Sequence, residues 1–400
     1  MRAFSVLFVL KMACFFSCFN AFADSNSSSI GDTEYTFRIR WPSGADPLSP
    51  PKQKFLYGFV FFRQCKDDRI RRGYFQKSVV LLTERPFVGL FRQVLRMLAA
   101  TYFDVGHPIL ESASHTIARW PLTTPESPLE LPFLGSMLYY TIPAHLNGSV
   151  GFGAMRKSSF ELAPNQFSLS SCAANIFHDF RDILADLWTF WELSLIAEPI
   201  VVMSSSPALC ADVVLGALAL ISPVAYGGDF RPYFTIHDTD FKEYTTRTKT
   251  PANVLLGVTN PFFVKAFEHW PHILRVGAAA KKKGGGGSLD FVPGLRTAYK
   301  RHVSVDRRLL KAVMERNVDE DSANALLLNH FQELTNAFLK PIETYFSTLV
   351  PSVAYESGEK YWIYVLKRGL NRAVSAFEPL PRLLPFEAVA FLATVEGKRT

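Results

Sequence analysis

The stretch Pro199-Ile-Val-Val-Met203, followed by Ser204-Ser-Ser-Pro207 and the apolar run 208–220, decides the fold of this chain. An apolar run without polar alternation is typical of a strand that is buried on both faces. Serine followed by proline predicts the cap and first turn of a helix that continues from Ala208 to Leu220. A buried strand that leads directly into a helix indicates an α/β domain with a mainly parallel sheet.

The same alternation extends to both sides of this stretch. Downstream we predict strands at 233–237, 254–258 and 273–276, a short helix capped by Asp240, and a helix that starts at Asn260-Pro261. Upstream we predict one helix from about Ile176, and its buried stripe consists of Phe177, Phe180, Leu184, Leu187, Trp188 and Trp191. Residues 176–277 are therefore predicted to form a three-layer α/β/α domain.

The chain before this domain has a different pattern. Residues 34–40 alternate as a strand, and 55–62 and 74–82 form a hairpin whose charged tip contains Arg69, Arg71 and Arg72. Glu84-Arg85-Pro86 opens a helix with apolar residues at helical spacing. We predict an antiparallel sheet plus helix over 23–119, and a connection with one hairpin over 120–175.

The end of the chain is predicted to be helical. Residues 278–294 contain Lys281-Lys-Lys283 and four consecutive glycines, which is typical of a flexible linker. Residues 295–350 carry helical periodicity, and 351–400 form a tail of different character.

Composition excludes several classes of protein. The 400 residues are 48% hydrophobic, which is enough to bury real cores. The net charge of +7 suits an anionic membrane surface or an acidic partner, but the 35 phenylalanines lie mostly in apolar periodic runs and do not favour nucleic-acid binding. The five cysteines form no C-x-x-C pair, so no zinc site or disulfide framework is indicated.

The chain contains no sequence motif that is typical of a catalytic site. The chain has no nucleophile elbow, no phosphate-binding loop and no dinucleotide fingerprint. Ser204 to Ser206 are predicted to be helix caps, and His237 and Asp238 are adjacent on a predicted strand, where they would point to opposite faces. His269 and His272 lack the spacing of a helical zinc motif. We expect no catalytic residues, no cofactor, no metal and no small-molecule substrate.

Residues 1–22 form an apolar leader. Arg2, the run from Phe4 to Leu10 and Ala21-Phe22-Ala23 have the order of parts of a signal peptide, whereas Lys11 interrupts the run. The leader therefore allows two interpretations, an export signal or an alternative start of a cytoplasmic protein.

Several stretches of the chain resemble the DENN domain-containing protein 6 subfamily. Its central DENN domain is similar to 191–203, to Asp229-Phe-Arg-Pro-Tyr-Phe-Thr-Ile-His-Asp238, to Leu256-Gly-Val-Thr-Asn-Pro-Phe-Phe263 and to 269–275. Tyr57-Gly-Phe-Val-Phe-Phe-Arg-Gln64 resembles its longin-like upstream lobe, and Phe331-Gln-Glu-Leu-Thr335 resembles the start of its helical downstream lobe. The upstream lobe is expected to be incomplete, because the leader stands where the family has further strands.

The resemblance implies a guanine nucleotide exchange factor for a Rab GTPase, peripheral on endosomal or recycling membranes. It also favours the cytoplasm, because export would separate the chain from every Rab. An exchange factor binds the nucleotide-free GTPase better than the GDP-bound form and needs no bond chemistry. The alternatives are a Rab-binding scaffold that does not drive exchange, and a GTPase-activating protein that uses Arg231 or Arg85.

The candidate GTPase contacts are polar residues that border the strand ends of the central domain. These residues are Asp229, Arg231, Asp238, Asp240, Lys242 and Glu243. Helix capping and solvation are the competing roles of the same side chains.

Overall fold

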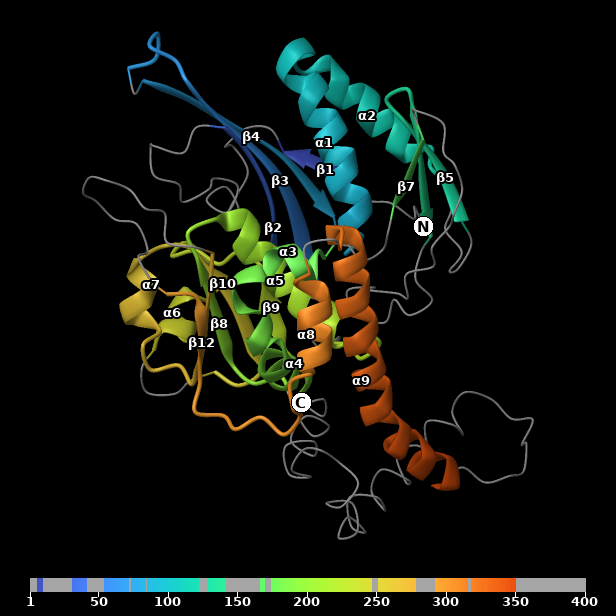
Figure 1. Cartoon of the computed structure of the whole chain (residues 1–400). Helices are drawn as coiled ribbons and strands as arrows, with labels where there is room; N and C mark the ends of the chain where they lie inside the picture. The colour runs from blue at the N-terminus through green and yellow to red at the C-terminus, as the bar shows by residue number, and fades with distance from the viewer. Residues whose placement is uncertain are drawn as a thin grey trace, which may run out of the picture.

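The computed structural model describes residues 6–9, 31–41, 54–71, 73–83, 85–121, 128–141, 166–169, 174–246, 251–277, 292–315 and 318–349 (Figure 1). Most of the predicted leader, residues 278–291 of the predicted linker and the tail 351–400 lie outside these residues. The described residues form an antiparallel N-terminal sheet, a smaller three-stranded sheet, a mainly parallel central sheet and the helices packed against them.

The N-terminal sheet has the strand order β1-β4-β3-β2, and all its neighbours are antiparallel. Its strands are β1 (Val6–Val9), β2 (Gly31–Trp41), β3 (Lys54–Lys66) and β4 (Tyr74–Thr83). The predicted strand at 34–40 and the predicted hairpin are confirmed, and the hairpin with its charged tip extends away from the other elements in Figure 1. Strand β1, from the leader, pairs with the end of β4.

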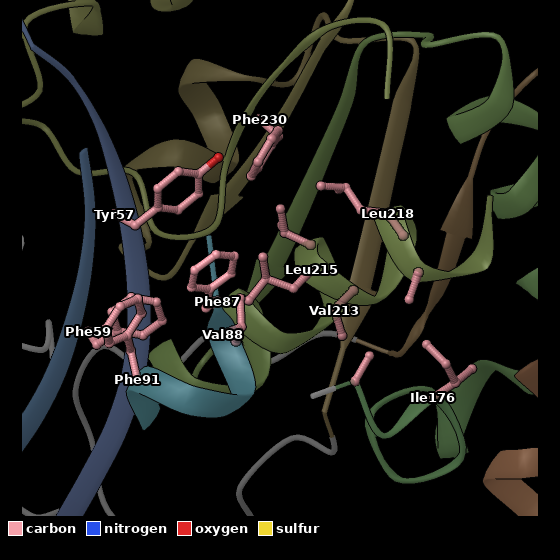
Figure 2. Packing of buried hydrophobic residues seen from close by; sticks show 14 of the residues in the cluster. Tyr57, Phe59, Phe87, Val88, Phe91, Ile176, Val213, Leu215, Leu218 and Phe230 are labelled. Atoms are coloured by element: carbon pink, nitrogen blue, oxygen red, sulfur yellow. The ribbon is translucent and has the colours of Figure 1, made fainter. Parts of the chain in front are cut away.

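Both faces of this sheet are covered, which explains the continuous apolar run of β3. Phe59 and Phe61 belong to the cluster that includes α1 (Val88–Val105), where the Phe59 and Phe91 rings lie 5.6 Å apart (Figure 2). Val60 and Phe62 belong to a second cluster with Tyr35, Phe37 and Ala211 of α5 (Pro207–Leu220). Side chains alternate along a strand, so consecutive apolar residues serve the two faces in turn.

The predicted hairpin in the connection is also confirmed. Helix α2 (Pro108–Ala118) is followed by β5 (Pro128–Phe133) and β6 (Ser136–Thr141), which pair antiparallel, and β7 (Gln166–Leu169) adds to β6 in parallel. The turn residues Leu134 and Gly135 both have positive φ, as a two-residue hairpin turn requires. Trp120 Nε1 donates to the Pro132 carbonyl at 2.9 Å and fixes this hairpin to the end of α2.

The central sheet confirms the prediction of a mainly parallel sheet. Its order is β12-β11-β8-β10-β9, and only β12 runs antiparallel among these strands. The strands are β8 (Ile200–Ser204), β9 (Asp229–Arg231), β10 (Val254–Val258), β11 (His272–Val276) and β12 (Gly294–Arg296). The side chain of Ser206 caps α5 by accepting from Leu209 N–H, as predicted.

Helix α5 joins the two large sheets. It packs against β8 and β10 of the central sheet and against β2 of the N-terminal sheet. Nearly all its residues are buried, including Val213, Leu215 and Leu218 (Figure 2), because it has neighbours all round.

Two predictions in the central region are wrong. Residues 233–237 form an irregular segment that ends in a turn instead of a strand, because Asp238 Oδ2 accepts from the Thr235 N–H at 2.7 Å and closes a loop. The single helix from Ile176 is three pieces, α3 (Ile176–Asp179), the 3-10 helix η1 (Arg181–Asp186) and α4 (Leu187–Leu195). The backbone leaves helical geometry at Phe180, where α3 ends, and again at Ile183 within η1, whose φ is −137°.

The remaining helices complete the fold. Short helices α6 (Phe241–Thr245) and α7 (Phe262–Ala266) follow β9 and β10, and α8 (Arg307–Val313) and α9 (Glu320–Leu349) confirm the predicted helical end. Trp191 Nε1 donates to Thr335 Oγ1 at 3.0 Å and fixes α9 to α4. Of the helices in the described ranges, none combines the length and the apolar character needed to span a membrane.

Candidate functional site

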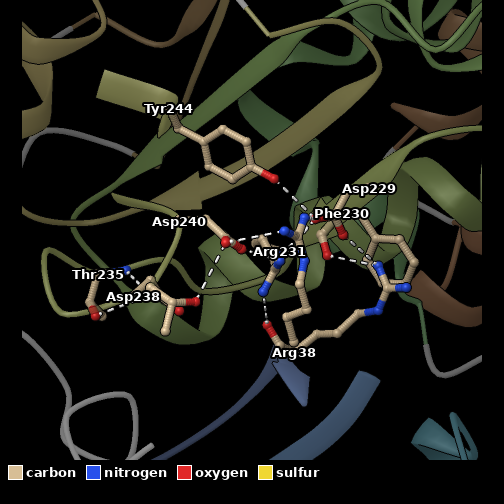
Figure 3. A network of polar contacts seen from close by, with 10 residues as sticks. Arg38, Asp229, Phe230, Arg231, Thr235, Asp238, Asp240 and Tyr244 are labelled. Carbon is tan, nitrogen blue, oxygen red and sulfur yellow. Dashed lines mark hydrogen bonds and ion pairs between the residues drawn. The ribbon is translucent and has the colours of Figure 1, made fainter. Parts of the chain in front are cut away.

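Polar side chains gather where an edge strand of the N-terminal sheet meets an edge strand of the central sheet (Figure 3). Strand β2 contributes Arg38 and Arg40, which are two residues apart and therefore share a face. Strand β9 contributes Asp229 and Arg231 in the same way, and Asp240 precedes α6. We call these five residues the junction cluster.

Asp229 is the shared acceptor of the cluster. It pairs with Arg38 Nη1 at 3.0 Å and with Arg231 Nη2 at 2.9 Å, and it accepts from the Tyr244 hydroxyl at 3.1 Å. Arg40 Nη2 lies 3.6 Å from the same carboxylate. One aspartate thus connects both strands and α6.

Arg231 is the most enclosed member. Its side chain is 1% exposed and donates through Nη2 to Asp240 Oδ2 at 2.6 Å. Burial acts against its charge, but Asp229 and Asp240 outweigh burial, and the pKa of Arg231 is raised. A buried guanidinium is tolerated here because two carboxylates compensate it.

Arg38 is held by stacking as well as by charge. Its guanidinium carbon lies 3.6 Å from the centre of the Phe55 ring and 3.9 Å from that of Phe230. Burial lowers the pKa of Arg38, and the nearby Tyr57 and Asp229 act in the opposite direction. The two rings shield the ion pair with Asp229 from water, which strengthens it.

A cavity of about 720 Å³ opens beside the junction cluster. Arg38, Arg40 and Phe55 line it from the N-terminal sheet, and residues 227–229 and 251–254 line it from the central sheet. Glu243, Tyr244 and Thr246 complete the wall.

The candidate contacts from the sequence divide into two groups. Asp229, Arg231 and Asp240 come together in the junction cluster, where their side chains are 14%, 1% and 9% exposed. Asp240 precedes α6 as predicted, but its carboxylate bonds to Arg231 and Arg40 and does not cap the helix. Asp238, Lys242 and Glu243 lie outside the cluster.

The second group lies on α6 and in the turn before it, where Asp238 is half-buried. Lys242 and Glu243 are exposed, and Asp238 bonds to Thr235 in the preceding turn. Large apolar side chains are exposed close by in the sequence and on α7, with Ile236 at 42% and Phe262 at 54%. The rings of Phe262 and Phe241 lie 6.0 Å apart, which places α7 beside α6.

Sequence reasoning missed Arg38, Arg40 and Tyr244. The signal available was the Arg-Ile-Arg pattern of 38–40, which puts two arginines on one face of a predicted strand. Within the described residues, no group of three or more His, Cys, Asp or Glu side chains could hold a metal ion.

Comparison with known proteins gives clear relatives. The chain is 37% identical over 409 residues to protein DENND6B of Homo sapiens, covering 95% of this chain and 67% of that protein. It is 35% identical over 409 residues to protein DENND6A of Gallus gallus, with the same shares covered. Against the DENND6 homolog of Dictyostelium discoideum it is 35% identical over 448 residues, covering 92% and 59%. No protein-family model matches the chain.

Proposed function

The chain belongs to the DENND6 family of DENN-domain proteins, and from this membership we propose that it is a guanine nucleotide exchange factor for a Rab GTPase. The proposal places the work on endosomal or recycling membranes, where the chain binds peripherally. Exchange needs a surface that holds the nucleotide-free GTPase more tightly than the GDP-bound form.

The observation that carries the proposal is the junction cluster. The largely enclosed ion pair between Arg38 on β2 and Asp229 on β9 holds the N-terminal and central sheets in one relative orientation. A GTPase that contacts both sheets would therefore meet a preformed surface, and binding energy would not be lost in aligning them. Preformed complementarity to the nucleotide-free state is what accelerates GDP release.

Within this proposal the six candidate residues have two roles. Lys242, Glu243 and Asp238 are the polar contacts to the GTPase, and the exposed Ile236 and Phe262 supply apolar contact beside them. Asp229, Arg231 and Asp240 position that surface from beneath, because their side chains are largely enclosed.

The burial of Arg231 argues against its use in GTPase activation. An arginine that stabilises hydrolysis must reach the nucleotide phosphates of the GTPase. Arg231 is 1% exposed and bonded to two aspartates, so it has no such reach in this arrangement. Arg85 is exposed and remains the arginine to test for that activity.

The deciding experiment is release of a fluorescent GDP analogue from a panel of Rab proteins, with and without the full chain. Faster release from one or a few Rabs is the expected result. Binding to a Rab without faster release would identify a scaffold, and faster hydrolysis with unchanged release would identify a GTPase-activating protein. Either of these two results would overturn the proposal.

A further inference from the structure

The cavity beside the junction cluster has the size of a small-molecule site. Its volume of about 720 Å³ falls within the usual range for ligand pockets. Phe55 and Tyr244 form an aromatic part of the cavity wall. Gly227 and Gly228 also line the cavity, and because they have no side chain, backbone atoms lie close to its interior. The cavity lies between two sheets, so a ligand there would touch both.

The junction cluster, of which Arg38, Arg40 and Asp229 line the cavity, carries an excess of positive charge. The junction cluster contains three guanidiniums, of Arg38, Arg40 and Arg231, and two carboxylates, of Asp229 and Asp240. With all five groups charged, the cluster has a net charge of +1, and its two carboxylates are shared among three guanidiniums. Excess charge in a largely enclosed setting is unfavourable until an anion or water compensates it.

Arg40 is the member of the junction cluster that has several hydrogen-bond donors without a partner among the described residues. It lines the cavity with its side chain 31% exposed, and it makes one long hydrogen bond, from Nη1 to Asp240 Oδ1 at 3.3 Å. Its Nη2 lies 3.6 Å from Asp229, beyond hydrogen-bond distance, and its Nε has no partner among the described residues. A guanidinium has five N–H donors, so most of those of Arg40 have no partner among the described residues, although the Nε atom is itself buried.

Glu243 does not supply the missing anion. It lines the same cavity, but among the described residues no ion pair within 4.0 Å joins it to Arg40 or Arg38. Its carboxylate is exposed on α6. The guanidinium of Arg40 and the carboxylate of Glu243 are therefore separate features of the cavity wall.

We propose that this cavity binds a small molecule through a phosphate group, which Arg40 holds at the floor while the organic part lies between Phe55 and Tyr244. The flat guanidinium fork matches phosphate oxygens, and the bonds it makes are charge-assisted. Binding uses groups from both sheets, so the occupied cavity stabilises the junction. The phosphate can come from a soluble phosphate ester or from a phosphoinositide headgroup.

The test measures phosphate binding directly and contains no GTPase, so its outcome is independent of the proposed exchange activity. Titration calorimetry of the full chain with inorganic phosphate and with glycerol 3-phosphate probes the soluble source. Co-sedimentation with phosphatidylcholine vesicles, with and without phosphatidylinositol 4-phosphate, probes the lipid source. Binding in either arm that depends on Arg40 supports the site, and the arm identifies the source.

Three variants make the test specific. Arg40→Gln should weaken binding at least about tenfold, equivalent to about 1.4 kcal/mol. Glu243→Gln should tighten it, because a carboxylate that repels the ligand is removed and no ion pair is lost. Arg119→Gln, an exposed arginine at the end of α2, is the matched control and should leave binding unchanged.

Two results would overturn the proposal. The first is that no probe binds to the folded wild-type chain. The second is that Arg40→Gln and Arg119→Gln weaken binding equally while Glu243→Gln does nothing, which would mean general attraction to a basic protein. Melting temperatures of all variants separate loss of binding from loss of folding, and Glu243→Gln breaks no ion pair of the cluster.

Discussion

Arg38 and Arg231 each donate a hydrogen bond to the other's strand. Arg38 Nη1 donates to the Phe230 carbonyl on β9 at 3.1 Å, and Arg231 Nη1 donates to the Arg38 carbonyl on β2 at 3.3 Å (Figure 3). The two strands are edges of different sheets, so the arginines connect backbones that make no ladder with each other. Geometry of this kind admits one relative position of the sheets, which an apolar contact alone would not specify.

Replacing the shared acceptor should loosen this junction. Asp229→Asn removes the charge opposite Arg38 and Arg231, and breaking one partner of a buried ion pair costs about 3–5 kcal/mol of unfolding free energy. Chemical denaturation measures the loss. The control is Asp32→Asn, because Asp32 lies on β2 as Arg38 does and pairs with Arg63 of β3 at 2.7 Å, but at the surface. That change should cost at most about 1 kcal/mol, and equal losses for the two variants would contradict the role of Asp229.

The sequence predicted those parts of the fold that depend on local signals. Ser206 and Pro207 identify the start of α5, and the apolar run of β10 identifies a buried strand, because caps and periodicity act within a few residues. Tyr233 and Phe234 are buried as expected, but they lie outside any strand, against Tyr35 and Phe263. The hydrophobicity of the two side chains indicated that they are buried, but it could not indicate which backbone conformation they adopt.

The site depends on contacts that no local pattern encodes. Asp229 and Arg231 were selected from the sequence as surface contacts, yet their partner Arg38 lies 191 residues from Asp229 along the chain. Alternation within β2 places Arg38 and Arg40 on one face, and only the packing of β2 beside β9 determines that this face is enclosed. Lys242 and Glu243 are exposed, as surface contacts require.

A cross-strand pair in the N-terminal sheet gives a second prediction. Phe37 and Gly58 face each other in the β2–β3 register, and a Cβ on Gly58 would come within 2.1 Å of the Phe37 ring. Gly58→Ala should therefore destabilise the fold by about 1–3 kcal/mol through overpacking.

The matching variant isolates the cause. Phe37→Ala should cost about 3–5 kcal/mol, because a buried ring is lost. The double variant should cost less than the sum of the two, because the new methyl then enters the space that the ring has left. Strict additivity in chemical denaturation would show that the ring is not what excludes a side chain at Gly58.

Asp179 should make stability depend on pH. Burial raises the pKa of this carboxyl from 3.8 to about 6, with Asp212 adding to the rise and the contact with His178 and the charge of Arg92 opposing it. The folded state thus holds a proton that the unfolded state releases between pH 3.8 and about 6, so this group lowers stability as pH rises through that window.

Asp179→Asn removes the penalty. The variant should be more stable than the wild type by about 3 kcal/mol at pH 8, and the difference should disappear below about pH 4. Thermal or chemical denaturation across this range measures it. Asp182→Asn, at an exposed neighbouring position, should show no such difference, and a gain for Asp179→Asn that is equal at all pH values would rule out titration as its cause.

The last prediction tests the exposed half of the proposed GTPase surface. Lys242→Glu combined with Glu243→Lys reverses two charges on α6 and leaves the net charge of the chain unchanged. Both side chains are exposed and outside the junction cluster, so the melting temperature should not move. If these residues face a GTPase, each reversed charge meets a like charge, and exchange should slow about tenfold or more. The control is Lys311→Glu combined with Glu111→Lys, which makes the same reversal at exposed positions on α8 and α2. GDP release that slows equally with both double variants, or with neither, would place the GTPase elsewhere on the molecule, and a slower rate with the α6 pair alone would place α6 in the contact.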